Sequence, residues 1–247
     1  MALIQIGTVS DLALETIAPR EAVPEQRVQT LGTAAEGAPA DQYRSVITRT
    51  PRGLALSKVL LRPGRRDLMS RLLLRSVPVY IVAWAWDLSG RPIEVYPVAV
   101  SGVENCTIPV GRDVRERTFS IGAGAPLFQP RQVYAGIAIR VQLWQSKGGV
   151  RNFGSTIANV ATMINSSELN RTLILLAAGT GIPGITLAAI AKLAGKVAEG
   201  VGNILKDSGD RFIDYFDGYF PATDPWSKGL DGPHIHEKTE ITFRRLV

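Results

Sequence analysis

The chain has 247 residues, a formal net charge of +6 and a single cysteine, Cys106. This length is enough for one large domain or two small ones, and it allows a sizeable core. Hydrophobic residues make up 45% and charged residues 20%, which is ordinary for a globular protein, and a lone cysteine excludes an internal disulfide bond.

Residues 1–43 form an acidic segment rich in proline and alanine. They hold six acidic and two basic residues and show no sustained periodicity. This composition predicts an irregular arm that becomes ordered only where a partner or the main body holds it. The first residues lack the basic start and long apolar core of a secretory signal. We therefore expect a cytoplasmic protein or one exported by a signal-free route.

Residues 44–150 are predicted to form a β-sandwich. In Val79–Trp86 the larger side chains alternate with smaller ones, which is typical of a strand whose smaller face packs closely against a sheet or a helix. Residues 133–145 have one strictly apolar face and predict the longest strand. Asp87–Gly90 predicts a hairpin turn, and residues 122–126 a loop. Shorter strands are predicted at 44–49, 53–61, 93–100, 107–110 and 117–121.

A block of basic residues lies at the start of this region. Residues 44–75 contain nine Lys and Arg side chains against one acid, Asp67. The block lacks aromatic residues, which makes nucleic acid a less favoured partner than an acidic protein surface or an anionic membrane. The residues predicted to bind an acidic partner are Arg62, Arg65, Arg66, Arg71 and Arg75.

Residues 151–206 are predicted to be a helical insertion that includes an amphipathic hairpin at 172–206. A helix at about 152–164 comes first, and the turn Gly179–Gly184 then separates a short apolar arm from a longer helix. Small residues at 191, 195 and 198 predict close packing of the two arms. The apolar stripe of the longer helix, predicted to face a sheet or a partner, consists of Ile190, Leu193, Val197, Val201 and Ile204.

The same hairpin has an alternative interpretation as a membrane-active element. Twenty residues between Arg171 and Lys192 carry no charge, and one continuous helix of that length would cross a bilayer. Pro183 and its neighbouring glycines interrupt such a helix, so we expect the hairpin to be packed in the free protein.

Residues 207–247 are predicted to be an acidic segment followed by a closing strand at 239–247. On a helix, four carboxylates of this segment would share one face and suit Ca²⁺; the alternative is an acidic face that pairs with the basic block. These carboxylates are Asp207, Asp210, Asp214 and Asp217.

The two histidines are a second candidate metal site. His234 and His236 would point to one face of a strand, as in some zinc sites, but Glu237, Asp231 or Asp224 would have to complete the ligands. The alternative is a surface loop.

Together these patterns predict a mainly β, α+β fold. It would be an antiparallel β-sandwich followed by a helical segment at about 151–206 and a returning C-terminal strand. We find no catalytic motif and no sign of a small-molecule substrate, which favours a non-catalytic interaction or assembly module over an enzyme. Such a module would dock to a protein partner or to itself. The alternatives are a membrane-active protein that uses 172–206 and a metal-dependent enzyme that uses Asp207–Asp217 or His234 and His236.

Overall fold

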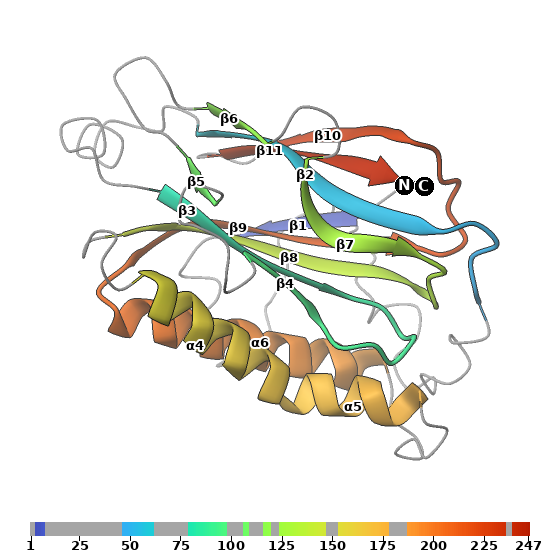
Figure 1. Ribbon diagram of the computed structural model, residues 1–247, viewed down its shortest axis with the longest axis horizontal. Coiled ribbons are helices and arrows are strands. Elements are labelled where there is room, and N and C mark those ends of the chain that lie inside the picture. The colour runs from blue at the N-terminus through green and yellow to red at the C-terminus, as the bar shows by residue number, and fades with distance from the viewer. Residues whose placement is uncertain are drawn as a thin grey trace, which may run out of the picture.

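A computed structural model describes residues 46–61, 79–97, 106–108, 116–119, 124–146, 153–177, 187–235 and 239–247, together with the backbone of residues 3–7. In this part of the chain, two antiparallel sheets and a layer of helices lie one above another (Figure 1). This arrangement confirms the predicted α+β fold with a sandwich of antiparallel sheets, a helical insertion and a returning C-terminal strand.

The larger sheet has six strands. Its order is β1 (Leu3–Gly7), β9 (Arg211–Pro221), β8 (Gly136–Gln145), β3 (Val79–Trp86) and β4 (Glu94–Tyr96), and β5 (Thr107–Ile108) also pairs with β3. The smaller sheet has five strands. Its order is β10 (Gly229–Ile235), β11 (Thr239–Leu246), β2 (Arg52–Leu61) and β6 (Glu116–Thr118), and β7 (Ala125–Arg131) also pairs with β2.

Three helices of the described chain connect β8 to β9. They are α4 (Phe153–Ser166), α5 (Glu168–Ala177) and α6 (Leu187–Asp207). Figure 1 shows them under the six-stranded sheet, on the side away from the five-stranded sheet. The six-stranded sheet is therefore the middle layer, with a sheet on one face and helices on the other.

Strand β3 shows why the middle sheet is apolar on both sides. All eight of its residues are buried. Trp86 lines a cavity together with Ile190 of α6, so the larger alternate side chains of β3 face the helices. The smaller side chains share the opposite side with Phe220 of β9, whose ring lies 6.1 Å from that of Phe243 in β11. The small face thus allows the second sheet to approach closely, as the alternation predicts.

Some predicted elements differ from those observed. Residues 3–7, predicted to be irregular, form β1 along β9, while the rest of the arm lies outside the described residues. Ala125 and Pro126 were predicted to lie in a loop but belong to β7, although this strand contains two prolines, which are poor strand formers. The segment around the histidines had a surface loop as its alternative interpretation. In the structure, Gly229–Ile235 instead pairs with β11 as a strand.

The predicted packing of the helices through small residues is wrong in detail. Ala191 is exposed, and a side chain added at Gly195 would meet no atom within 4 Å. The close approach occurs instead at Gly200 of α6, where an added Cβ would lie 3.1 Å from the Met163 side chain of α4. Ala198 is fully buried, but the other two members of the predicted set, Ala191 and Gly195, are not closely packed.

Candidate functional site

The four aspartates of the predicted calcium site do not lie on a helical face. Asp207 ends α6 and is exposed, and Asp210 follows in a turn. Asp214 and Asp217 belong to strand β9. Leu143 pairs with Asp214 while the adjacent Trp144 pairs with Phe212, so β9 contains a bulge that places one extra residue between these pairs. The helical interpretation of this segment is therefore wrong.

Three of these carboxyl groups have partners within the chain. Asp210 Oδ2 accepts a hydrogen bond of 2.6 Å from the Tyr80 hydroxyl, and burial together with this bond raises the pKa of Tyr80. Asp214 is fully buried and accepts 2.7 Å from the Thr239 hydroxyl. The predicted calcium ligands are thus engaged in separate contacts.

Asp217 forms an ion pair on the helix-facing side of the middle sheet. Both of its carboxylate oxygens accept hydrogen bonds from Arg140, which lies opposite it on β8. The Arg140 guanidinium is buried and stands over the Tyr215 ring, 5.4 Å from its centroid. A two-point contact of this kind fixes the geometry of both side chains. Both carboxylate oxygens of Asp217 are therefore already paired within the sheet, which makes Asp217 a poor cation ligand.

His234 lies beside an aspartate, as the zinc hypothesis requires, but that aspartate has a second partner. His234 Nε2 is 2.7 Å from Asp231 Oδ1, and Arg245 donates to the other oxygen. The hydrogen bond from His234, and then that from Arg245, lower the pKa of Asp231 against the opposing effect of burial. His236 lies outside the described residues. Within the described part of the chain, no three His, Cys, Asp or Glu side chains lie close enough to share a metal ion.

A charged cluster that the sequence reasoning missed joins the two sheets along one side. Glu94 of β4 accepts hydrogen bonds from the Arg131 side chain and from the Gln129 backbone of β7. Arg131 also lies 3.4 Å from Asp87, which is only 2% exposed. Asp87 was predicted to lie in a hairpin turn.

A second set of long-range contacts fixes the loop after β9 to strand β2. The buried Arg52 of β2 donates to the backbone carbonyls of Pro221, Ala222 and Asp224. Burial is the main cause that lowers the pKa of Arg52. Its guanidinium also stands 5.2 Å from the centroid of Trp226. These contacts give Arg52 a structural role and leave it out of the exposed basic block.

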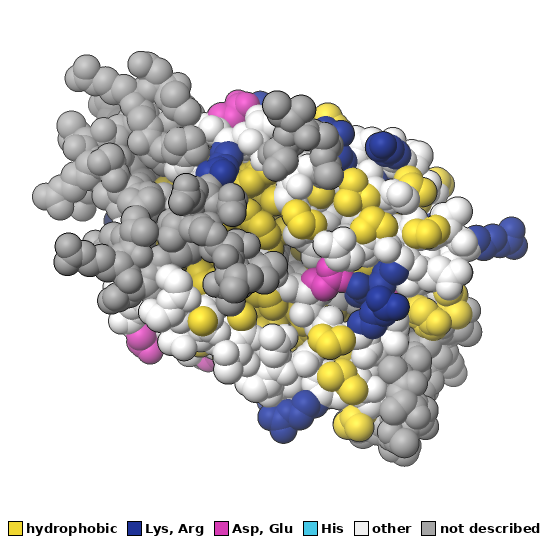
Figure 2. Space-filling view, viewed as in Figure 1, with side chains coloured by type: hydrophobic (Ala, Val, Ile, Leu, Met, Phe, Trp, Pro, Cys, Tyr) yellow, Lys and Arg dark blue, Asp and Glu magenta, His cyan; other side chains and the backbone are white. Residues whose placement is uncertain are grey.

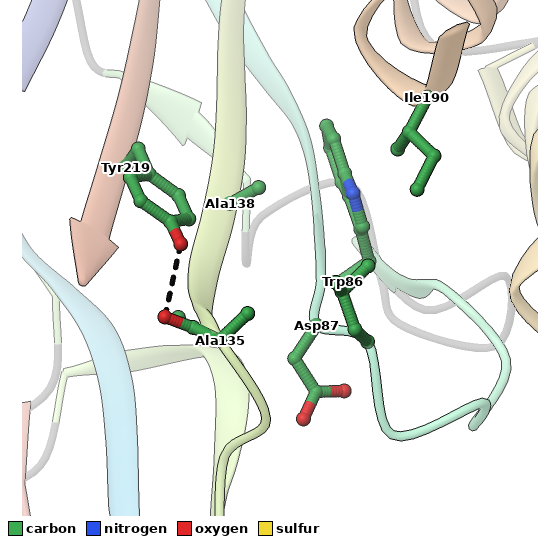
Figure 3. A pocket seen from close by; sticks show the side chains of 8 residues that line it. Trp86, Asp87, Ala135, Ala138, Ile190 and Tyr219 are labelled. Carbon is green, nitrogen blue, oxygen red and sulfur yellow. Dashed lines mark hydrogen bonds between the residues drawn. The ribbon is translucent and has the colours of Figure 1, made fainter. Parts of the chain in front are cut away.

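A small cavity opens at the end of the middle sheet next to α6 (Figure 3). Trp86 and Ala138 from the sheet and Ile190 from α6 line it, and the Tyr219 hydroxyl donates 2.9 Å to the Ala135 carbonyl beside it. Its volume of about 20 Å³ accommodates roughly one water molecule. A cavity of this size is too small for an organic substrate.

The apolar stripe of α6 packs on the core. Ile190, Val197 and Val201 are at most 3% exposed, and Leu193 and Ile204 are partly buried against the same cluster. Of the helices in the described residues, none combines the length and apolarity needed to cross a bilayer.

The predicted acidic-partner residues Arg62, Arg65, Arg66, Arg71 and Arg75 lie outside the described residues. Figure 2 shows that the described Lys and Arg side chains on the visible face form small separate groups. The one cysteine, Cys106, is fully buried, and burial raises the pKa of its thiol to about 12. The thiol is therefore protonated at neutral pH and is a poor nucleophile.

No family model, no curated protein and no solved structure matches this chain.

Proposed function

We propose that this chain is a non-catalytic interaction or assembly module. In this proposal the β-sandwich and its helical layer are a scaffold, and the basic block around Arg62–Arg75 makes the contact with an acidic protein surface. The observation that carries the proposal is that the carboxylates best suited to metal binding or acid–base chemistry are engaged inside the fold. Asp214 contacts Thr239, and Asp217 contacts Arg140.

The same contacts narrow the choice of acidic partner. Residues 207–240 contain eight acidic side chains, which made this segment a candidate complement for the basic block. Asp214, Asp217 and Asp231 already have partners within the fold. The excess positive charge of residues 44–75 is therefore better matched by the acidic arm of a second copy or by another acidic protein.

The test compares two triple variants of the full chain with equal changes in charge. Arg62, Arg65 and Arg66 are replaced by Glu in one variant. The control replaces Arg91, Arg211 and Lys228, which are exposed and lie outside the block. Light scattering measures self-association, and polyglutamate serves as a probe for an acidic protein surface. We expect the first variant to lose salt-sensitive binding or self-association and the control to keep it.

Equal behaviour of wild type and both variants in both assays would refute the proposed role of the block. Vesicles that contain phosphatidylserine provide a separate readout. Leakage of these vesicles, without binding to polyglutamate or self-association, would favour the membrane-active alternative. That alternative requires the apolar stripe of α6 to leave the sheet on which it packs.

A further inference from the structure

Among the N–H donors that the helix-facing side of the middle sheet buries without an acceptor in the described residues, two belong to neutral side chains. They are the indole nitrogen of Trp84 in β3 and the side-chain amide nitrogen of Gln142 in β8. Trp84 is 1% exposed and Gln142 is 0% exposed, so bulk water does not reach either group. A buried donor without an acceptor is strongly unfavourable, and native interiors rarely leave one unsatisfied.

The two donors are neighbours in the sheet. Trp84 pairs with Arg140, and Gln142 pairs with Val82, so Trp84 and Gln142 are diagonal to each other on the same side. Diagonal positions of this kind are about 7–8 Å apart at the backbone, and long side chains reach across them. This register is compatible with one acceptor shared by the two side chains.

The orientation of the Gln142 amide is set by a third side chain. Trp144 Nε1 donates a hydrogen bond of 3.1 Å to Gln142 Oε1. If the amide were flipped, two N–H groups would face each other at this contact, so Nε2 is the end directed away from Trp144. The unsatisfied donor at Gln142 is thus a consequence of the hydrogen-bond network rather than of an arbitrary amide assignment.

The surroundings favour a small neutral acceptor. Arg140, which pairs with Trp84 across the two strands, forms an ion pair with Asp217 that balances its charge. On the face of α6 that packs on the core, Val197 and Val201 are buried and have no polar side-chain atom. Trp86, two residues from Trp84 on the same side, lines the water-sized cavity.

We propose that one water molecule occupies a site between Trp84 and Gln142, on the helix-facing side of the middle sheet, and accepts a hydrogen bond from both side chains. Water is the ligand that supplies a neutral oxygen in the least volume. The site lies within the middle layer, so the water remains bound for far longer than surface water does.

Magnetization transfer from water to nitrogen-bound protons tests this site in the wild-type protein. The Trp84 indole proton, assigned with Trp84→Phe, and the Gln142 amide protons are both expected to show cross-peaks to a water molecule with the sign of slow tumbling. The absence of either cross-peak in the wild type overturns the proposal, and this measurement does not depend on the folding of any variant.

A substitution extends the test. Gln142→Met keeps the length of the side chain and removes its amide. We expect the cross-peak at Trp84 to be lost in this variant, because the water loses one of its two donors. A cross-peak of undiminished strength at Trp84 would show that Gln142 does not hold the water, and it would overturn the shared site.

Discussion

The hydroxyl of Thr239 donates a hydrogen bond of 2.7 Å to Asp214 Oδ2, and both side chains are completely buried. Because Asp214 belongs to β9 and Thr239 to β11, this bond joins the two sheets of the sandwich in its interior. The backbone N–H of Tyr215 donates to the other carboxyl oxygen. Asp214 therefore has a structural role in the interior instead of the metal-binding role that its acidic neighbours suggested.

Replacing Thr239 by valine tests the energy of this contact. Valine has nearly the same shape but no hydroxyl, so it leaves a buried carboxyl group without one of its donors. We expect the free energy of unfolding to fall by about 1–3 kcal/mol. Urea denaturation measures this loss, with the exposed Thr118→Val in β6 as the control. Equal stability of the two variants would mean that the bond contributes nothing.

Replacing Val197 by aspartate tests whether α6 is packed on the sheet. Val197 is 3% exposed, and a charge placed there is buried without a partner. We expect a loss of at least about 3 kcal/mol in the free energy of unfolding, or failure to fold. The control, Ala191→Asp, lies on the exposed side of the same helix. A Val197→Asp variant that folds and assembles like wild type but no longer permeates vesicles would contradict the packed arrangement.

The stability of the protein should depend on the protonation of Asp231. Its contacts with His234 and Arg245 lower its pKa in the folded state. The stabilisation from this group is therefore present above the unfolded aspartate pKa of about 3.9, and it is lost as the pH falls through the lower folded pKa.

We therefore expect Asp231→Asn to be less stable than wild type at neutral pH and to approach wild type in acid. Chemical denaturation over a pH series measures the difference, with the exposed Asp207→Asn as a control. A difference between Asp231→Asn and wild type that does not change with pH would contradict the lowered pKa.

Ala135 offers a test of backbone strain. Its φ angle of 65° lies in the left-handed region, which an alanine side chain disfavours. The conformation is held because its N–H donates to Val46 and its carbonyl accepts from Ala222 and Tyr219. We expect Ala135→Gly to raise the free energy of unfolding by about 0.5–1 kcal/mol and to raise Tm. Ala138→Gly, within β8, should instead lower it, and a fall in both variants would show that Ala135 is not strained.

Strands with clear alternation could be predicted from the sequence. The predicted strand Val79–Trp86 matches β3. The closing strand predicted at 239–247 matches β11, in which Ile241 and Phe243 are buried as expected. In these segments the two sides of the strand differ in size or polarity. The longer predicted helix was also placed well, because its apolar residues recur at helical spacing in α6.

Strand β9 shows why other elements could not be predicted. The acidic residues 207, 210, 214 and 217 recur every three or four positions, which imitates a helical face. In the structure their positions reflect the end of α6, a turn, and a strand with a bulge. The partners of Asp214 and Asp217 are Thr239 and Arg140, which lie far away in the sequence. No local pattern identifies such contacts, so the candidate site was interpreted as a cation site.

The pairing of β2 with β11 determines when this chain can fold during its synthesis. Residues 52–61 leave the ribosome long before residues 239–246, which are their neighbour in the sheet. In the same way, β8 must wait for the three helices to be made before β9 can cover its second edge. The nascent chain therefore carries apolar strands with open edges until residues 239–246 have been made, and such strands promote aggregation. We conclude that the five-stranded sheet cannot be completed before residues 239–246 are made, and that a premature stop shortly before residue 239 removes the partner of a strand made nearly two hundred residues earlier.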